Sequence, residues 1–340
     1  MENPGSMSTS QHILTGQTER IASVSPAASV RILSKITLIA TFLLLIAGAL
    51  VTGNKAAMSD PTWPTFVGHT VPKYFQGGLK YEDSHRIAAG TVGILTLLLA
   101  IVIQFNDPRR FMRKLGWWAF ALVVVQALFG GLIIKSIRNP LVSMTHASIA
   151  QAFFCVTVAI AVLASNMWFR DLTRPPVERA ANRGYIKFLK VACFIVYLQI
   201  IMGAGVRHSN DNPTQDMFIP HLLAHIGGAF AVICVVIWLN MRTWHVYRDI
   251  APLRKTAIIS ALLVLYQIAF GIMSIFANRE RLKIEMPTTW DVTVSTAHLL
   301  GGACLLAVLF GTLIRSYRIL DLSAPVHIQG QAYQSREVTP

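Results

Sequence analysis

Long apolar stretches, separated by short polar segments, dominate the pattern of hydrophobic and polar positions along the 340-residue chain. A helix that crosses the hydrocarbon core of a bilayer needs about 20 mostly apolar residues. Eight stretches meet this requirement, so the pattern predicts an all-α membrane protein with eight transmembrane helices. The expected spans cover residues 32–52, 84–105, 115–135, 141–165, 186–206, 220–241, 255–277 and 292–314.

Composition agrees with this class. Hydrophobic residues make up 54% of the chain and charged residues 14%, whereas a soluble globular domain carries about 25% charged residues. The net charge of +14 could suggest nucleic-acid binding, but its distribution does not. The side of the eight spans that holds both termini carries 20 of the 30 Lys and Arg residues, and the opposite side carries 10. The positive-inside rule therefore places both termini in the cytoplasm of a multi-pass protein of the bacterial inner membrane.

A polar, Pro-containing segment at residues 170–183 divides the spans into two groups of four. The third and seventh spans share a Gln-x-x-x-Gly element, and the fifth has a related one, which indicates two similar four-helix bundles. The expected organisation is a disordered cytoplasmic tail (1–30), an N-terminal half (31–165), a cytoplasmic linker (166–185), a C-terminal half (186–318) and a second cytoplasmic tail (319–340). The Gln-x-x-x-Gly elements are Gln126–Gly130, Gln199–Gly203 and Gln267–Gly271.

Four histidines, His85, His146, His225 and His298, lie about five residues inside the outer ends of four spans, two in each half. Ionisable side chains inside membrane helices are expensive and mark functional sites by default. A single such histidine often only bonds a neighbouring helix, but four at one depth in two matched pairs favour a shared function. Neutral imidazoles facing each other across a bundle are suited to ligating haem iron. A zinc site would bring four ligands to one ion instead.

Two charged residues flank the first of these histidines, in the segment Glu82-Asp-Ser-His85-Arg86. Glu82 lies one helical turn from His85 and could handle protons at the mouth of the pocket; the alternative is a solvated residue at a helix start. Arg86 could pair with a haem propionate; the alternative is a side chain that extends to the membrane interface.

These motifs together resemble the haem A synthase family. The resemblance covers about residues 31–318 and rests on Glu82-x-x-His85-Arg86, on Asp60-Pro-Thr-Trp63-Pro64 after Val51-Thr52-Gly53, and on the later helix histidines with their Gln-x-x-x-Gly partners. Some family members carry a cysteine pair in the first outer loop; this chain has no cysteine there, so a thiol step in that loop is excluded.

The resemblance implies a membrane oxidoreductase that converts the C8 methyl of haem O to a formyl group, giving haem A for terminal oxidases. It implies that His225 and His298 hold a haem b cofactor while His85 and His146 meet the substrate haem, with Glu82 managing protons. The expected partners are haem O, the lipid bilayer, an electron donor, haem O synthase and terminal oxidase assembly factors, but no nucleic acid. Two other classes remain open: a di-haem b electron-transfer protein without its own chemistry, and a transporter with parallel repeats and no haem.

Overall fold

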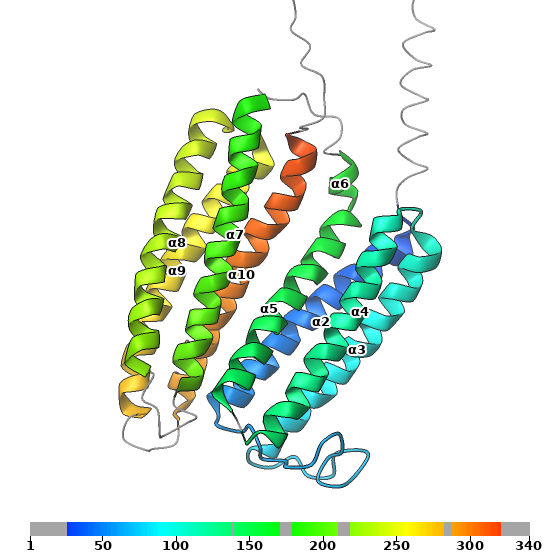
Figure 1. Cartoon of the computed structure of the whole chain (residues 1–340), viewed down its shortest axis with the longest axis vertical. Helices are drawn as coiled ribbons and strands as arrows, with labels where there is room; N and C mark the ends of the chain where they lie inside the picture. The colour runs from blue at the N-terminus through cyan, green and yellow to red at the C-terminus, as the bar shows by residue number, and fades with distance from the viewer. Residues whose placement is uncertain (1–25, 138, 171–178, 210–217, 282–286, 321–340) are drawn as a thin grey trace, which may run out of the picture.

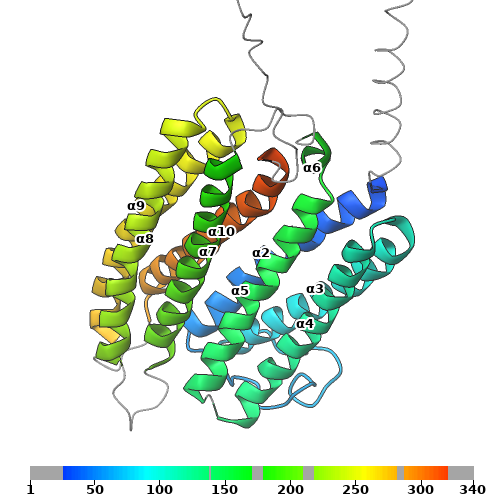
Figure 2. The ribbon, with the colours of Figure 1, turned by 45° about the horizontal axis from the view of Figure 1, so that its top comes forward.

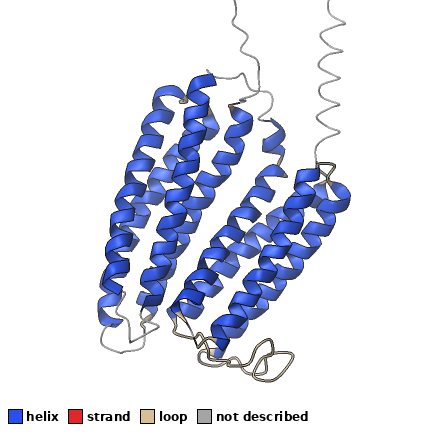
Figure 3. Cartoon of the chain, in the orientation of Figure 1, coloured by secondary structure: helices blue, strands red, loops and turns tan. Residues whose placement is uncertain are grey.

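The computed structural model describes residues 26–137, 139–170, 179–209, 218–281 and 287–320, and every regular element within these ranges is a helix (Figure 3). Eight of these helices are long and apolar enough to cross a membrane, which confirms the prediction of eight spans. They are α2 (Ala28–Gly53), α3 (Leu79–Asn106), α4 (Arg110–Lys135), α5 (Pro140–Leu163), α7 (Arg179–His208), α8 (Phe218–Val246), α9 (Ala251–Arg281) and α10 (Thr289–Ile319). Large apolar side chains such as Phe105, Leu141 and Leu265 face outward, as expected of a multi-pass membrane protein.

The eight helices pack as two rings of four. In the first ring α2 contacts α3, α3 contacts α4, α4 contacts α5, and α5 returns to α2; α7, α8, α9 and α10 close in the same way. Figures 1 and 2 show the two rings side by side. Each ring has its own apolar core, around Leu99, Ile103 and Ile160 in the first and around Leu189, Leu239 and Leu309 in the second. The arrangement is consistent with the expected pair of four-helix bundles.

The rings meet where α5 and α2 contact α10 and where α5 contacts α7, and we call this contact the inter-ring interface. Phe154, Val158 and Ala303 form a small buried cluster there. Two hydrogen bonds also cross it: Tyr197 Oη donates to the carbonyl of Ser148 (3.0 Å), and Arg207 Nη2 donates to the carbonyl of Ala49 (2.7 Å).

Several helix starts follow from local chemistry. Asn139 accepts a hydrogen bond from the backbone of Leu141 ahead of Pro140, which suits the first position of a helix. Thr288 and Asp291 cap each other's backbone N–H groups at the start of α10.

The beginning of α2, the end of α10 and the short helix α6 (Asn166–Arg170) lie at one end of the molecule, and the loop of residues 54–78 lies at the other (Figure 1).

The segment expected to be a linker, residues 166–185, is partly helical. It contains α6 and the first residues of α7, which begins at Arg179, seven residues before the apolar stretch that marked the span. Polar residues lengthen α7 because a helix can extend beyond the hydrocarbon core into the headgroup region. Residues 171–178, and most of the two predicted tails (1–25 and 321–340), lie outside the described residues.

Candidate functional site

Each of the four predicted histidines lies against a glycine of the preceding helix. A Cβ atom added to any of these glycines would crowd or touch Cε1 of the facing imidazole, so the absence of a side chain makes room for the ring. The pairs, with the distance from that Cβ position to Cε1, are Gly48–His85 (3.1 Å), Gly130–His146 (3.4 Å), Gly203–His225 (2.9 Å) and Gly271–His298 (3.1 Å). The same contact therefore recurs twice in each ring, on α3, α5, α8 and α10.

Three of these glycines are preceded, one turn earlier, by the glutamine of the Gln-x-x-x-Gly element. Its side-chain amide donates a hydrogen bond to the main-chain carbonyl of the facing histidine, and this bond ties the two helices together at the level of the imidazole. The bonds run from Gln126 to His146 (2.9 Å), from Gln199 to His225 (2.8 Å) and from Gln267 to His298 (2.8 Å).

His85 differs from the other three. The residue one turn before Gly48 is Leu44, whose side chain has no hydrogen-bond donor. Within the described residues, the helix turn that carries His85 therefore lacks the amide bond found at His146, His225 and His298.

The second ring shows how the imidazoles are oriented. His225 Nδ1 lies 3.1 Å from the carbonyl oxygen of Gln199. Because a carbonyl only accepts, this contact requires the proton on Nδ1, which leaves a lone pair on Nε2. That Nε2 lies 3.5 Å from the side-chain nitrogen of Gln199. The rings of His225 and His298 are neighbours in a T-shaped arrangement, with centres 6.1 Å apart and planes at 82°.

This spacing can be compared with what one iron would need. Two imidazoles that bind one metal ion from opposite sides, each with a metal–nitrogen bond of about 2.0–2.1 Å, have ring centres roughly 6 Å apart when both Nε2 atoms point at the ion. The observed 6.1 Å agrees. A haem iron that is bound from both faces of the porphyrin can take two neutral imidazoles as its protein ligands. The pair His225 and His298 therefore fits a haem.

Not all of the glycines near the second pair leave space for a ligand. Cβ atoms at Gly228 and Gly301, each three residues after a histidine, would collide with the side chains of Gln199 and Gln267. These two glycines therefore admit the bridging glutamines. By contrast, a Cβ at Gly90, Gly93 or Gly227 would meet no heavy atom within 4 Å.

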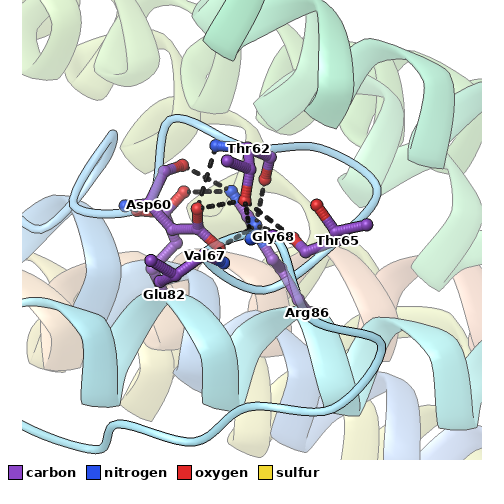
Figure 4. Close-up of polar contacts among 7 residues, drawn as sticks. All are labelled: Asp60, Thr62, Thr65, Val67, Gly68, Glu82 and Arg86. Carbon is purple, nitrogen blue, oxygen red and sulfur yellow. Dashed lines mark hydrogen bonds and ion pairs between the residues drawn. The ribbon is translucent and has the colours of Figure 1, made fainter.

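The residues that flank His85 form a buried ionic network with the loop of residues 54–78 (Figure 4). Arg86 Nη1 donates to Asp60 Oδ2 (2.7 Å), and Arg86 Nη2 donates to Glu82 Oε1 (2.7 Å) and to the carbonyl of Asp60 (2.8 Å). The other carboxylate oxygen of Glu82 accepts from the backbone N–H of Asp60 (3.0 Å). Asp60 is fully buried and Glu82 is 6% exposed. Glu82 is therefore an internal part of the network, not a solvated helix-start residue.

Asp60 organises the loop itself. Its Oδ1 accepts from the backbone N–H and the hydroxyl of Thr62, and its Oδ2 accepts from the backbone N–H of Val67. Burial raises the pKa of Asp60, but these hydrogen bonds and the Arg86 guanidinium outweigh burial, so the pKa lies below its ordinary value. The sequence motif Asp60-Pro-Thr-Trp63-Pro64 contained this residue, but its ionic partners could not be identified without the fold.

The structure thus brings Glu82 and Arg86 together with a carboxylate from the loop. Both Nη atoms of Arg86 are bonded to protein atoms, namely Asp60, Glu82 and the carbonyls of Thr62 and Thr65. Asp83, next to Glu82, is also buried, with Oδ1 unbonded among the described residues. The carboxyl groups of Glu82 and Asp83 and the guanidinium of Arg86 therefore lie within one turn of His85, and the carboxyl group of Asp60 lies in the adjoining loop.

The chain is similar to known proteins over most of its length. The chain is 27% identical to a protein of Geobacillus thermodenitrificans named heme A synthase, over 83% of this chain and 90% of that protein. It is 26% identical to proteins of the same name from Alkalihalophilus pseudofirmus, over 87% of this chain and 98% of that protein, and from Geobacillus kaustophilus, over 87% and 95%.

The sequence model of the COX15-CtaA family, described as cytochrome oxidase assembly protein, matches residues 79–310. That match spans α3 to most of α10 and includes all four histidines together with Glu82 and Arg86. Since it covers well over half of the chain, the protein belongs to the COX15-CtaA family of cytochrome oxidase assembly proteins.

Proposed function

We propose that this protein is a haem A synthase, a membrane oxidoreductase that converts the C8 methyl of haem O to a formyl group. The relatives that carry this name align with most of the chain, and the helical rings provide two histidine pairs, as binding of a substrate haem and a cofactor haem requires. In this reaction the methyl is hydroxylated twice. Each hydroxylation takes one oxygen atom from O2, while two electrons from the donor and two protons reduce the other oxygen atom to water. The resulting gem-diol loses water to give the formyl group.

His225 and His298 hold the cofactor, which we take to be haem b. The observation that carries this assignment is the 6.1 Å separation of the two neighbouring rings, each backed by a glycine and by a glutamine bond to its main-chain carbonyl. When bound there, the haem supplies electron transfer. The protein contributes two oriented ligands, of which His225 is fixed in its tautomer by the carbonyl of Gln199.

His85 and His146 meet the substrate haem. The absence of a glutamine opposite His85 makes this pair unequal, because only His146 is tied to its neighbouring helix by an amide. A substrate must enter and its product must leave, and a pair in which one histidine lacks this amide bond suits such exchange. By the same reasoning, the evenly held pair in the second ring suits a permanent cofactor.

Glu82 holds or moves a proton near the reacting edge of the substrate. Its carboxylate lies one turn from His85 and is bonded to Arg86 and to the backbone of Asp60. The positive charge of Arg86 lies beside the same histidine, where it would attract a haem propionate. Because its Nη atoms already bond the loop, a propionate would share the guanidinium with Asp60.

Orientation and partners complete the proposal. Both termini lie on the cytoplasmic side of a bacterial inner membrane in this proposal, which the excess of Lys and Arg on their side supports. The histidine layer then lies near the outer face. Haem O reaches the first ring from the bilayer, and haem O synthase, oxidase assembly factors and an electron donor act with the protein.

Haem analysis of the purified protein tests the assignment. Haem extracted from the protein and separated by chromatography is expected to contain haem b together with haem O, a hydroxylated intermediate or haem A. Haem b alone, in two equivalents per chain, would instead indicate a di-haem electron-transfer protein. Protein without any haem would contradict the proposal.

A further inference from the structure

The indole of Trp63, in the loop of residues 54–78, lies on the backbone of α4. A Cβ atom at Gly131 would lie 2.7 Å from both Cδ2 and Cε2 of that ring, and 2.9 Å from Cε3. Any side chain larger than hydrogen would displace the ring, because an ordinary contact between carbon atoms is about 3.5–4.0 Å. The indole therefore packs directly on the backbone at Gly131.

Arg86 fixes the same tryptophan from the other side. Its Nη1 donates to the carbonyls of Thr62 (2.7 Å) and Thr65 (3.0 Å), which are the residues immediately before and after Trp63-Pro64. Asp60 bonds the backbone of Thr62 and of Val67 and holds the rest of the turn. Figure 4 shows the loop wrapped around this guanidinium. The position of the indole is thus set by α3 through Arg86 and by α4 through Gly131.

Both anchors adjoin the first histidine pair. Arg86 follows His85 in sequence, and Gly131 follows Gly130, which faces His146. Trp63 therefore bridges the two helix positions next to His85 and His146, at the outer ends of α3 and α4. The indole is still 36% exposed, so part of its aromatic surface is available for another contact.

We propose that Trp63 is a substrate-positioning residue, whose indole forms the outer wall of the first-ring haem pocket and contacts the edge of haem O. The inference rests on the proposed function, since it places substrate at His85 and His146. A flat, rigid indole clamped at two points offers van der Waals and stacking contact to a flat macrocycle.

Binding of haem O to three variants tests the proposal. Purified protein that retains its second-ring haem is titrated with haem O, and the Kd is read from the Soret band. Trp63→Ala is expected to raise the Kd about tenfold, since an aromatic contact plus its buried area is worth about 1–2 kcal/mol. Trp63→Phe should restore most of the affinity. Gly131→Ala should raise the Kd while leaving the indole present but displaced.

Control measurements distinguish a Trp63 side chain that contacts haem O from one that only stabilises the fold. Gly184→Ala, at the cytoplasmic start of α7 where a Cβ meets nothing within 4 Å, should bind haem O like the parent. Second-ring haem content should not change in any variant, and Trp63→Phe should keep the parental Tm. Parental Kd values for Trp63→Ala and Gly131→Ala would overturn the proposal, as would an equal loss in Trp63→Phe with a lowered Tm. If the parent itself neither binds haem O nor forms haem A, the proposed function fails instead.

Discussion

Gly203→Ala is the most direct perturbation of the cofactor pair, because it adds one methyl group at the closest of the four glycine–histidine contacts. The new Cβ would lie 2.9 Å from Cε1 and 3.4 Å from Nδ1 of His225. An ordinary carbon contact needs about 3.5–4.0 Å, so the ring must move by about 0.6–1 Å or the helices must separate. The bond from Nδ1 to the carbonyl of Gln199 opposes rotation of the ring. The ring therefore moves mainly at Nε2, which is the proposed ligand atom.

Overpacking of this kind costs about 1–3 kcal/mol, which corresponds to a fall in haem affinity of about 5- to 140-fold. The loss of haem affinity should be smaller where the added Cβ lies farther from the imidazole. Gly271→Ala, at 3.1 Å from His298, should lower haem b affinity by a similar or smaller factor, and Gly130→Ala, at 3.4 Å from His146, should leave haem b bound.

The assay is haem b content per purified chain, measured as the pyridine haemochrome, followed by the Kd for haem b added back to the stripped protein. Gly184→Ala is the matched control, because it places the same methyl group on the same helix without a neighbour. Parental haem b affinity in Gly203→Ala would show that the imidazole of His225 is not held where the ligand is needed, and the reasoning would be wrong.

Three further predictions concern the histidines, the acid near His85 and the loop. His298→Ala should lose haem b, whereas His146→Ala should keep it and stop forming haem A; equal loss in both, seen in absorbance spectra, would indicate a permanent di-haem protein. Glu82→Gln should lower haem A formation about 10²- to 10⁴-fold while haem b remains, and a parental rate in a haem O turnover assay would restrict Glu82 to anchoring the loop. Because the pKa of Asp60 is lowered on folding, its ionised form stabilises the loop above the ordinary carboxyl pKa, and this stabilisation should disappear as pH falls through the lowered value. Proteolysis of the outer loop should accordingly increase on acidification in the parent, and Asp60→Asn, which cannot ionise, should not show that dependence.

The eight spans could be predicted from the sequence because length and apolarity alone define them. Their ends could not, since polar residues extend α7 back to Arg179 and nothing in an apolar window records that. The histidines were visible as ionisable residues in apolar segments. The glycine facing each histidine was visible in three cases only as part of Gln-x-x-x-Gly, and Gly48, which lacks the glutamine, carried no signal.

The charged residues near His85 illustrate a different limit. The sequence predicted that Glu82 lies one helical turn from His85, whereas the ion pair of Glu82 with Arg86, at 2.7 Å, was not predicted. Their common partner, Asp60, lies 22 residues from Glu82 in sequence, and a contact at that separation depends on the path of the loop. Trp63 and Gly131 are likewise brought together only by that path.

The inter-ring interface has a consequence for how the molecule assembles. Between helices in lipid there is no hydrophobic driving force, so association depends on close packing and on polar bonds. Each ring closes on itself, and the contact between rings includes the cluster around Phe154, Val158 and Ala303, with partly buried side chains such as Phe42 and Phe310 packed against it, and two hydrogen bonds to main-chain carbonyls. The packing of α5 and α2 against α10, and of α5 against α7, therefore sets how far one histidine pair lies from the other.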